Sequence, residues 1–542
     1  MIDLASQYAV KFDYWENGRL AESFFLFSPD DEIKEKVKAE YENHGFTQEI
    51  LHLVRQDETE LSYIQADYKK HSIHAFRSIT SHYEIFYKKT TFVPEGIIIS
   101  DHLLNLLSYL PIQERNVCLA GVCDMFLFQH SYGKETYYQG VYRLGCGEEL
   151  LYQNQELLVR QVQRLQLQKY DLGGRDGADV LEQSLREACA KIQKPESVNT
   201  LSGGIDSTLT HIIMGNPKSV SGSYEHEKFL CEKEYALCAA KLLYADHKVY
   251  DISLENYMEE MVRTVKHCGM PVYNMTAQII HHILAEEVNT SYMMVSELAG
   301  AVYGLELRTP YTKELAGKYS FSDFNNYANQ NSSIARKEDI DWISRIFGKE
   351  MVEAQLQKRN NYVLDRLEGF DTSDLGSDNY LQFGHLLYYF TNNGVSALEQ
   401  TEMVFGKTVN ALFSAKKVVE EFLSLPLHER YENEIYGEKP FAKKLLERLL
   451  PEYEVKKKKL GGSLPRTWMV TEGPMAGYFK THDIPSFIDP SLRNIFLEPS
   501  WETSWCVKYL VMYSVWYENV MRCEVKKLPS KYQVSFESNT AE

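Results

Sequence analysis

The sequence predicts an α/β protein in two parts: a layered, β-rich part in residues 1–175 and a doubly wound α/β part with helical additions in residues 176–542. Three observations support this prediction. Short, aromatic-rich runs dominate the first part, as in half-buried strands. Residues 198–214, which read VNTLSGGIDSTLTHIIM, give a buried strand, a tight glycine loop and an apolar helix in succession. Strand and helix patterns then alternate to residue 252, which is typical of a parallel sheet covered by helices.

The first part combines strand and helix patterns. Strands are expected at residues 23–27, 83–87 and 96–100, and helices at 31–44 and 102–110. The polar stretch 153–171 is interpreted as a helix, and the glycine-rich turn 172–177 as the linker to the second part.

The second part begins with a helix at residues 178–192 that leads into the strand before the glycine loop. Further strands are expected at 219–224 and 247–252, with a helix at 234–243 between them, and residues 292–304 are expected to form a fourth strand and a second loop. Helical patterns dominate residues 321–400, and an aromatic-rich helix is expected at 504–520.

The glycine loop between strand and helix has the chemistry of a phosphate site. Backbone N–H groups at a helix start converge on one spot, and the helix dipole adds positive potential there. Gly203 and Gly204 carry no Cβ, so the backbone can approach a phosphate closely. Ser202 and Ser207 offer hydroxyl donors. Asp206 is an acid within an anion site, which indicates that Mg²⁺ bridges it to the phosphates.

Composition excludes several functional classes. The chain is 44% hydrophobic and carries a formal net charge of −18, which disfavours a general affinity for nucleic acid or anionic membranes. Neither a signal peptide nor a membrane span is expected. Nine scattered cysteines without a C-x-x-C pair indicate free thiols in a reducing compartment and no zinc site. We expect a cytoplasmic protein, for which a homodimer is one option.

The loop lacks the G-x-x-x-x-G-K-[ST] spacing of a Walker A motif. Its sequence S-G-G-I-D-S resembles the pyrophosphate loop of N-type ATP pyrophosphatases, which split ATP between the α and β phosphates. The resemblance implies ATP and Mg²⁺ as cofactors, with Asp206 as the metal ligand. The alternative is an ordinary strand-to-helix turn. The loop residues assigned to ATP binding are Leu201, Ser202, Gly203, Gly204, Asp206 and Ser207.

Residues 137–150, YYQGVYRLGCGEEL, resemble the strand that ends the glutaminase domain of asparagine synthetases, with Cys146 in place of a proline. The resemblance implies an Ntn-type αββα domain in residues 1–175. Glutamine hydrolysis needs an N-terminal cysteine whose own amine acts as base, but position 2 is Ile2 and the first cysteine is Cys118. The domain is therefore expected either to support its neighbour or to shield a substrate.

Residues 292–304 resemble the asparagine synthetase signature S-G-E-G-A-D-E-L-F-G. Glu297, Ala299 and Tyr303 fit, whereas Gly300 and Ala301 replace the Asp–Glu pair whose Asp helps to hold Mg²⁺ in that family. Three readings stay open: Glu297 acts in its place, Asp206 and phosphate suffice, or the site is inactive. A buried structural role is the plain alternative for Glu297.

Further segments of the second part fit the same family in spacing. Residues 393–426 and 439–468 follow its late motifs, although the Pro-Phe-Leu-Asp tetrad is replaced by residues 411–414. Glu399 is a candidate for catalysis, with helix capping as the alternative. The resemblance implies that Lys439 contacts pyrophosphate and that Lys459 stabilises the reacting acyl-adenylate. The remaining candidates, for cofactor binding, are Ser221 beside the adenine and Ser296 in the second loop.

The resemblance implies an ATP-dependent, AMP-forming carbon–nitrogen ligase with a carboxylate and an amine as substrates. Without a glutaminase, it looks like β-lactam synthetases and lasso-peptide macrocyclases, so natural-product or antibiotic biosynthesis is the expected setting. The alternative is a degenerate homologue that binds a nucleotide or a partner protein. Adenylation or thiolation of tRNA fits less well, because the chain is acidic and has no clear RNA-binding module.

Overall fold

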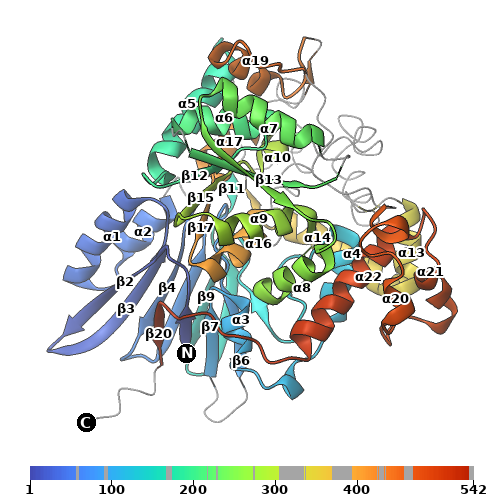
Figure 1. Cartoon of the computed structure of the whole chain (residues 1–542). Coiled ribbons are helices and arrows are strands. Elements are labelled where there is room, and N and C mark those ends of the chain that lie inside the picture. The colour runs from blue at the N-terminus through green and yellow to red at the C-terminus, as the bar shows by residue number, and fades with distance from the viewer. Residues whose placement is uncertain are drawn as a thin grey trace.

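A computed structural model shows the architecture of the chain (Figure 1). The residues that it describes are 1–56, 60–90, 96–166, 172, 174–215, 218–226, 230–272, 275–303, 335, 337–368, 394–423, 425, 432–433, 435–456 and 468–535.

The N-terminal part contains two sheets packed face to face. The first has the order β10 (Glu156–Gln161), β9 (Glu148–Gln153), β5 (Ser72–Arg77), β4 (Ser62–Asp67), β3 (Arg19–Phe27), β2 (Ala9–Glu16) and is antiparallel. The second has the order β20 (Tyr532–Val534), β1 (Ile2–Leu4), β7 (Gly96–Ser100), β6 (Phe86–Thr90), β8 (Tyr142–Arg143). Buried side chains from both sheets, such as Phe25, Ile64, Tyr87 and Ile99, form the core between them.

Helices cover the outer faces of both sheets, so the N-terminal part has four layers. Helices α1 (Asp31–His44) and α2 (Gln48–Gln56) pack on the six-stranded sheet, where Tyr41 and Phe24 lie in one core. Helix α3 (Leu103–Leu107) packs on β6 and β7, and α4 (Leu119–Phe128) joins the same larger core. Asp30 caps α1 by accepting a hydrogen bond from Glu32 N at 2.8 Å.

The second part is built on a parallel five-stranded sheet. Its order is β14 (Asp246–Ile252), β13 (Lys218–Tyr224), β12 (Val198–Thr200), β15 (Tyr292–Val295), β17 (Thr408–Ala411). The chain moves outward from β12 through β13 to β14, and then returns to place β15 on the other side of β12. Strand order therefore reverses beside β12, which is where ligands bind in open α/β sheets.

Helices lie on both faces of this sheet (Figure 1). One face carries α5 (Gly177–Ile192), α6 (Ile205–Met214), α7 (Leu230–Leu242), α17 (Lys416–Leu423) and α19 (Pro440–Leu449). The face toward the N-terminal sheets carries α8 (Tyr257–Cys268), α9 (Met275–Glu287) and α16 (Val395–Glu402). Further elements are α10 (Ala299–Tyr303), α13 (Lys337–Phe347), α14 (Lys349–Leu364), α20 (Tyr478–Thr481), α21 (Arg493–Leu497), α22 (Ser504–Trp516), and the short pairs β11 (Leu165–Gln166) with β16 (Leu367–Glu368) and β18 (Glu432–Asn433) with β19 (Gly437–Glu438).

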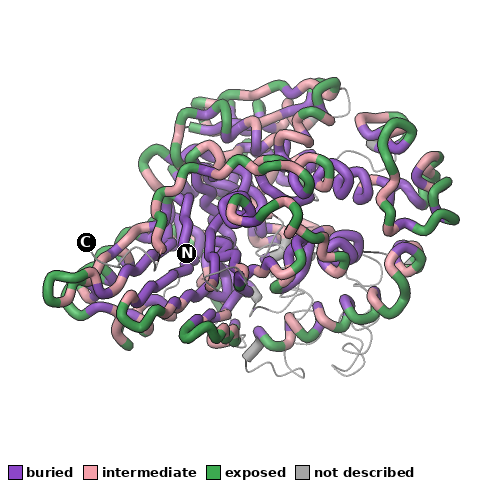
Figure 2. Tube along the Cα trace, turned by 90° about the horizontal axis from the view of Figure 1, so that it is seen from below, coloured by how far each residue is buried: buried purple, intermediate pink, exposed green. Residues whose placement is uncertain are grey.

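Helix α16 joins the two parts of the chain, and each of its residues is buried. Ser396 donates its hydroxyl to His82 O at 3.1 Å, and His102 Nε2 lies 2.8 Å from Gln400 O. Tyr8 donates to Asn410 Oδ1 in the neighbouring β17. Figure 2 shows buried residues gathered in the interior of the molecule and exposed residues on its outside.

A last strand returns to the N-terminal sheet. Strand β20 pairs antiparallel with β1, with Ile2 opposite Val534 and Leu4 opposite Tyr532. Lys527 Nζ approaches the fully buried Asp3 carboxylate at 2.5 Å, and Leu528 N donates to Asn105 Oδ1 at 2.8 Å. The C-terminal segment is therefore part of the N-terminal sheet structure.

Most expected elements are confirmed, including the strand at 219–224, a fourth strand within 292–304 and the helix at 31–44. The helix expected at 153–171 is wrong: residues 148–161 form the β9–β10 hairpin, because Leu157 and Val159 alternate with exposed residues along one sheet face. Expected helices within 304–334 and 369–393 lie outside the described residues. Among the helices that are described, none has the length and apolar character needed to cross a membrane.

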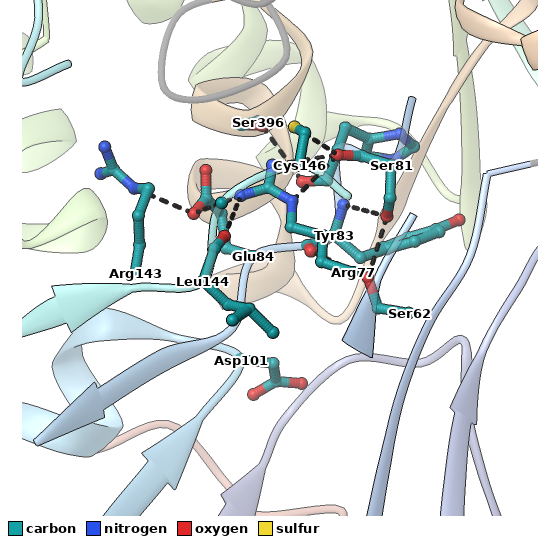
Figure 3. A network of polar contacts seen from close by, with 12 residues as sticks. Ser62, Arg77, Ser81, Tyr83, Glu84, Asp101, Arg143, Leu144, Cys146 and Ser396 are labelled. Atoms are coloured by element: carbon teal, nitrogen blue, oxygen red, sulfur yellow. Dashed lines mark hydrogen bonds and ion pairs between the residues drawn. The ribbon is translucent and has the colours of Figure 1, made fainter. Parts of the chain in front are cut away.

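Two buried arginines share one carboxylate at the edge of the N-terminal part (Figure 3). Arg77 Nη1 and Arg143 Nε donate to Glu84 Oε2 at 3.2 and 3.1 Å. Arg77 also donates to Ser81 O and Leu144 O. All three charged side chains are almost completely excluded from solvent. Glu84 thus balances two desolvated cations.

We expect Glu84→Gln to lower the free energy of unfolding by about 3–5 kcal/mol, because removing the charge of Glu84 leaves two buried cations without a counter-charge. Urea denaturation followed by circular dichroism measures this loss. The matched control, Asp251→Asn, breaks the partly exposed ion pair with Lys233 and should cost at most about 1 kcal/mol. Equal losses in the two variants would contradict the assignment.

Candidate functional site

The candidate site lies at the carboxyl end of β12, beside the reversal of strand order. Leu201 follows the strand, is fully buried and donates its N–H to Val220 O at 2.8 Å. Residues 202–204 then turn into α6, which has Gly204 as its N-cap without a capping side chain. The first N–H groups of α6 therefore have no capping side chain in competition with a ligand.

Gly203 fixes the path of the loop. Its φ is 69°, a left-handed value, and a Cβ built at this position would lie 2.1 Å from Tyr235 O in α7. The atoms that a Cβ would meet belong to the backbone of α7, so no flexible side chain could move to relieve the clash. Tyr453 donates its hydroxyl to Gly203 O at 2.7 Å and holds the same peptide from the other side. No sequence signal pointed to Tyr453.

The two loop serines contact each other. Ser202 Oγ lies 3.0 Å from Ser207 Oγ, and Ser202 N donates to Ser207 Oγ at 3.2 Å. Asn199 Nδ2 donates to Ser207 O at 3.0 Å from within β12. The strand end and the first turn of α6 are thus tied together, which orients the hydroxyl groups.

Asp206 and Lys439 meet although they are far apart in the sequence. Lys439 Nζ forms an ion pair with Asp206 Oδ2, and the other carboxylate oxygen, Oδ1, is buried without a hydrogen-bond partner among the described residues. Lys439 precedes α19 with a φ of 59°, and Pro440 occupies the first turn of the helix. This conformation directs a lysine from α19 toward the first turn of α6.

A divalent cation would fit this arrangement together with a phosphate, because the orphaned Asp206 Oδ1 can ligate the metal while the helix start binds the phosphate. No group of three or more His, Cys, Asp or Glu residues is arranged as a metal site within the described ranges. A magnesium ion at Asp206 would therefore depend on phosphate oxygens and water for its remaining ligands.

The second loop follows β15, next to β12. Ser296 donates its hydroxyl to Thr210 Oγ1 of α6 at 3.1 Å, so the side chain connects the second loop to the helix that follows the glycine loop. Leu298 is buried at a φ of 76°, at the position of a glycine in the signature; a bulky residue is an outlier there. Glu297 is half-buried in the same loop, and its proposed catalytic role stays a prediction.

Ser221 lies in the middle of β13 and not at its carboxyl end. Its hydroxyl is 3.1 Å from His247 Nε2, and Ser219 Oγ is 2.9 Å from the other ring nitrogen. Burial lowers the pKa of His247, so a neutral ring bridges the two serines. The Ser221 side chain is thus hydrogen-bonded within the sheet. The pairing of β12 with β13 ends at Val220, so β13 continues beyond it without β12 as a neighbour.

Glu399 is in a different place. The side chain is buried in α16 and accepts a hydrogen bond from Val409 N at 2.7 Å, near the start of β17. The glycine loop, in contrast, follows the carboxyl end of β12. Burial raises the pKa of Glu399 to about 8, opposed by the nearby His82. Its catalytic role stays a prediction, and Lys459 lies outside the described residues.

Gly203→Ala should lower the free energy of unfolding substantially more than Gly215→Ala. Both glycines have a left-handed φ, which costs an alanine about 1 kcal/mol. Only the Gly203 Cβ meets backbone atoms, whereas open space surrounds that of Gly215, so we expect about 1–3 kcal/mol more for Gly203→Ala. Denaturant unfolding of both variants measures the difference, and equal values would refute the close approach.

Stability should depend on pH through Glu399. Its folded pKa of about 8 exceeds the ordinary value of 4.5, so the folded state binds the proton more tightly. The stabilisation is complete below about pH 4.5 and is lost as pH rises toward 8. Glu399→Gln mimics the neutral acid. The melting temperature of the variant minus that of wild type should therefore increase from pH 5 to pH 8. Glu35→Gln, at an exposed position of α1, should show a difference that does not vary with pH.

Comparison with known proteins defines the family. A family model described as asparagine synthase matches residues 177–483, more than half of the chain. No curated protein matches the chain. The match spans the parallel sheet, the glycine loop, the second loop and Lys439. The family comprises ATP-dependent carbon–nitrogen ligases, which generally use Mg²⁺ with ATP. The chain therefore belongs to the asparagine synthase family.

Proposed function

We propose that this protein adenylates a substrate carboxylate with ATP, releases pyrophosphate, and joins the acyl group to a substrate amine without hydrolysing glutamine. The observation that carries the proposal is the meeting of Asp206 and Lys439 at the glycine loop. An acid and a lysine beside the first turn of a helix suit a metal-bound polyphosphate.

Each part of the nucleotide has a candidate partner. The first N–H groups of α6, together with Ser202 and Ser207, face the β and γ phosphates. Lys439 adds a point charge for the leaving pyrophosphate. Alternation along β13 puts Gly222 on the same side as Val220, whose carbonyl accepts from Leu201. Gly222 lies beyond the last β12 pair, so its backbone is free of β12 and suits an adenine edge.

Magnesium would be held by Asp206 Oδ1 and would supply charge neutralisation on the phosphates. Lys439 would release Asp206 in part when the phosphates bind, because they offer a stronger concentration of negative charge. The carboxylate substrate then attacks the α phosphorus and expels pyrophosphate. The bound amine attacks the acyl carbon of the adenylate, expels AMP and loses a proton as the amide forms. Holding both reactants in one site supplies much of the rate enhancement.

The amine is proposed to come from a substrate. Burial raises the pKa of five described thiols, which disfavours the reactive thiolate that glutamine hydrolysis requires. These thiols belong to Cys118, Cys123, Cys146, Cys189 and Cys268.

We further propose that residues 1–175 form a degenerate glutaminase-like domain and residues 176–542 the synthetase domain, since the family match begins at residue 177. Eight of the nine cysteines, those whose side chains are described, are free thiols, which supports a reducing, cytoplasmic setting. The proposal includes a small-molecule or peptide substrate in natural-product biosynthesis and a homodimeric assembly.

A second candidate function is binding without catalysis, of a nucleotide or of a partner protein. Gly300 and Ala301 favour it, because they remove two carboxylates at the position where the signature has its acid pair. The two functions differ in turnover: a ligase exchanges pyrophosphate into ATP when the correct acid is present, whereas a binding protein only retains the nucleotide.

Asp206→Asn should reduce carboxylate-dependent ATP–pyrophosphate exchange by at least about 100-fold, because a metal ligand and its charge are lost together. Exchange is measured with a panel of amino acids and other carboxylates. The control is Asp31→Asn, which removes the ion-pair partner of a different lysine, Lys194. This variant should leave exchange unchanged. Nucleotide binding by wild type without exchange for any acid would favour the second candidate.

A further inference from the structure

Tyr303 carries a hydroxyl group that the fold leaves without a partner. The residue ends α10, directly after the second loop, and is completely buried. Phe413 and Phe422 pack edge-on against its ring, with centroids 5.7 and 6.3 Å away. These contacts fix the ring, but the hydroxyl oxygen has no hydrogen bond to any described residue.

The Tyr303 ring lies beside the Asp206–Lys439 pair. Lys439 Nζ lies 5.6 Å from the centroid of the Tyr303 ring, and the charge of Asp206 acts on the phenol. Asp206 Oδ1 is likewise buried and unpartnered. Elements α6, α10 and α19 thus bring an orphaned phenol, an orphaned carboxylate oxygen and an ammonium together.

Two orphaned polar atoms at one place indicate a missing ligand. Buried hydroxyl groups are nearly always hydrogen-bonded, because leaving one unpaired is costly. Packing alone would be served equally well by phenylalanine, the residue that the asparagine synthetase signature has at this position. The extra oxygen therefore has a use that the core does not explain.

We propose that the Tyr303 hydroxyl donates a hydrogen bond to a β- or γ-phosphate oxygen of ATP and to the departing pyrophosphate. It would thereby supply part of the charge stabilisation that the signature's missing acid pair, at Gly300 and Ala301, would otherwise provide through a metal ion. The inference rests on the proposed function and assigns a positioning contact that the family's signature lacks.

The charges around the phenol suit a donor. Burial, reinforced by Asp206, holds the pKa of Tyr303 well above its ordinary value, so the hydroxyl keeps its proton. A neutral donor adds no charge beside Lys439 and Asp206, and its hydrogen bond strengthens as negative charge accumulates on the pyrophosphate.

Tyr303→Phe removes only this oxygen. Binding of Mg²⁺ with α,β-methylene ATP, and of Mg²⁺ with pyrophosphate, should weaken by about 10- to 100-fold, the loss expected for one hydrogen bond to a charged acceptor. AMP, which lacks the β and γ phosphates, should bind within about twofold of wild type. Isothermal titration measures all three affinities.

The control is Tyr41→Phe, the same change at another fully buried tyrosine whose hydroxyl has no partner, in the core between α1 and the six-stranded sheet. All three affinities should stay at wild-type values in this variant. The melting temperature of ligand-free Tyr303→Phe should equal or exceed that of wild type, because an unpaired buried hydroxyl is removed. A lower melting temperature would reveal a structural partner and overturn the inference.

The remaining outcomes separate the two proposals. If wild type binds neither methylene ATP nor pyrophosphate, the proposed function itself fails. If wild type binds both and Tyr303→Phe binds them equally well, only the present inference fails. A parallel loss of AMP affinity would assign the hydroxyl to the α phosphate and contradict the β,γ contact. A loss that disappears when Mg²⁺ is omitted would show that the hydroxyl acts through the metal and not on phosphate.

Discussion

The close approach of Gly203 to the Tyr235 carbonyl is the constraint on which the candidate site depends. It lets the loop after β12 pass under α7 with a left-handed backbone, so that α6 begins at the point where strand order reverses. The helix start, the Ser202–Ser207 contact and the Asp206 side chain all take their positions from this turn. Any side chain at Gly203 would push two backbones apart.

The sequence predicted four of the five parallel strands because their pattern is local: each strand is short, and helices of ordinary length lie between them. Strand β17 was not expected, because its residues were assigned only to a family motif. The glycine loop was also predicted, since the motif S-G-G-I-D-S is typical of a tight turn between a strand and a helix. The β9–β10 hairpin was misread because its polar outer face hides the alternation of Leu157 and Val159. The strand order, the Tyr453 contact and the Tyr303 environment depend on residues hundreds of positions apart, and no local pattern reports them.

The site and the junction both hold buried polar groups. At the junction, Val409 N donates to one oxygen of Glu399, and the other oxygen, Oε1, has no hydrogen-bond partner among the described residues. At the loop, Asp206 and Tyr303 likewise keep buried oxygens without partners. Unsatisfied groups reduce stability; at the loop, the proposed nucleotide would pair these oxygens, and Phe413 holds the Tyr303 ring in place.

The pairing of β20 with β1 has a consequence for biosynthesis. Ile2 lies opposite Val534, so more than 500 residues separate the two strands along the chain. During translation, the outer edge of β1 emerges early and stays unpaired until β20 has left the ribosome. An unpaired strand edge invites association with other nascent chains. The N-terminal sheet thus completes its folding after translation of the synthetase part, and the aggregation risk falls on the interval between these two events.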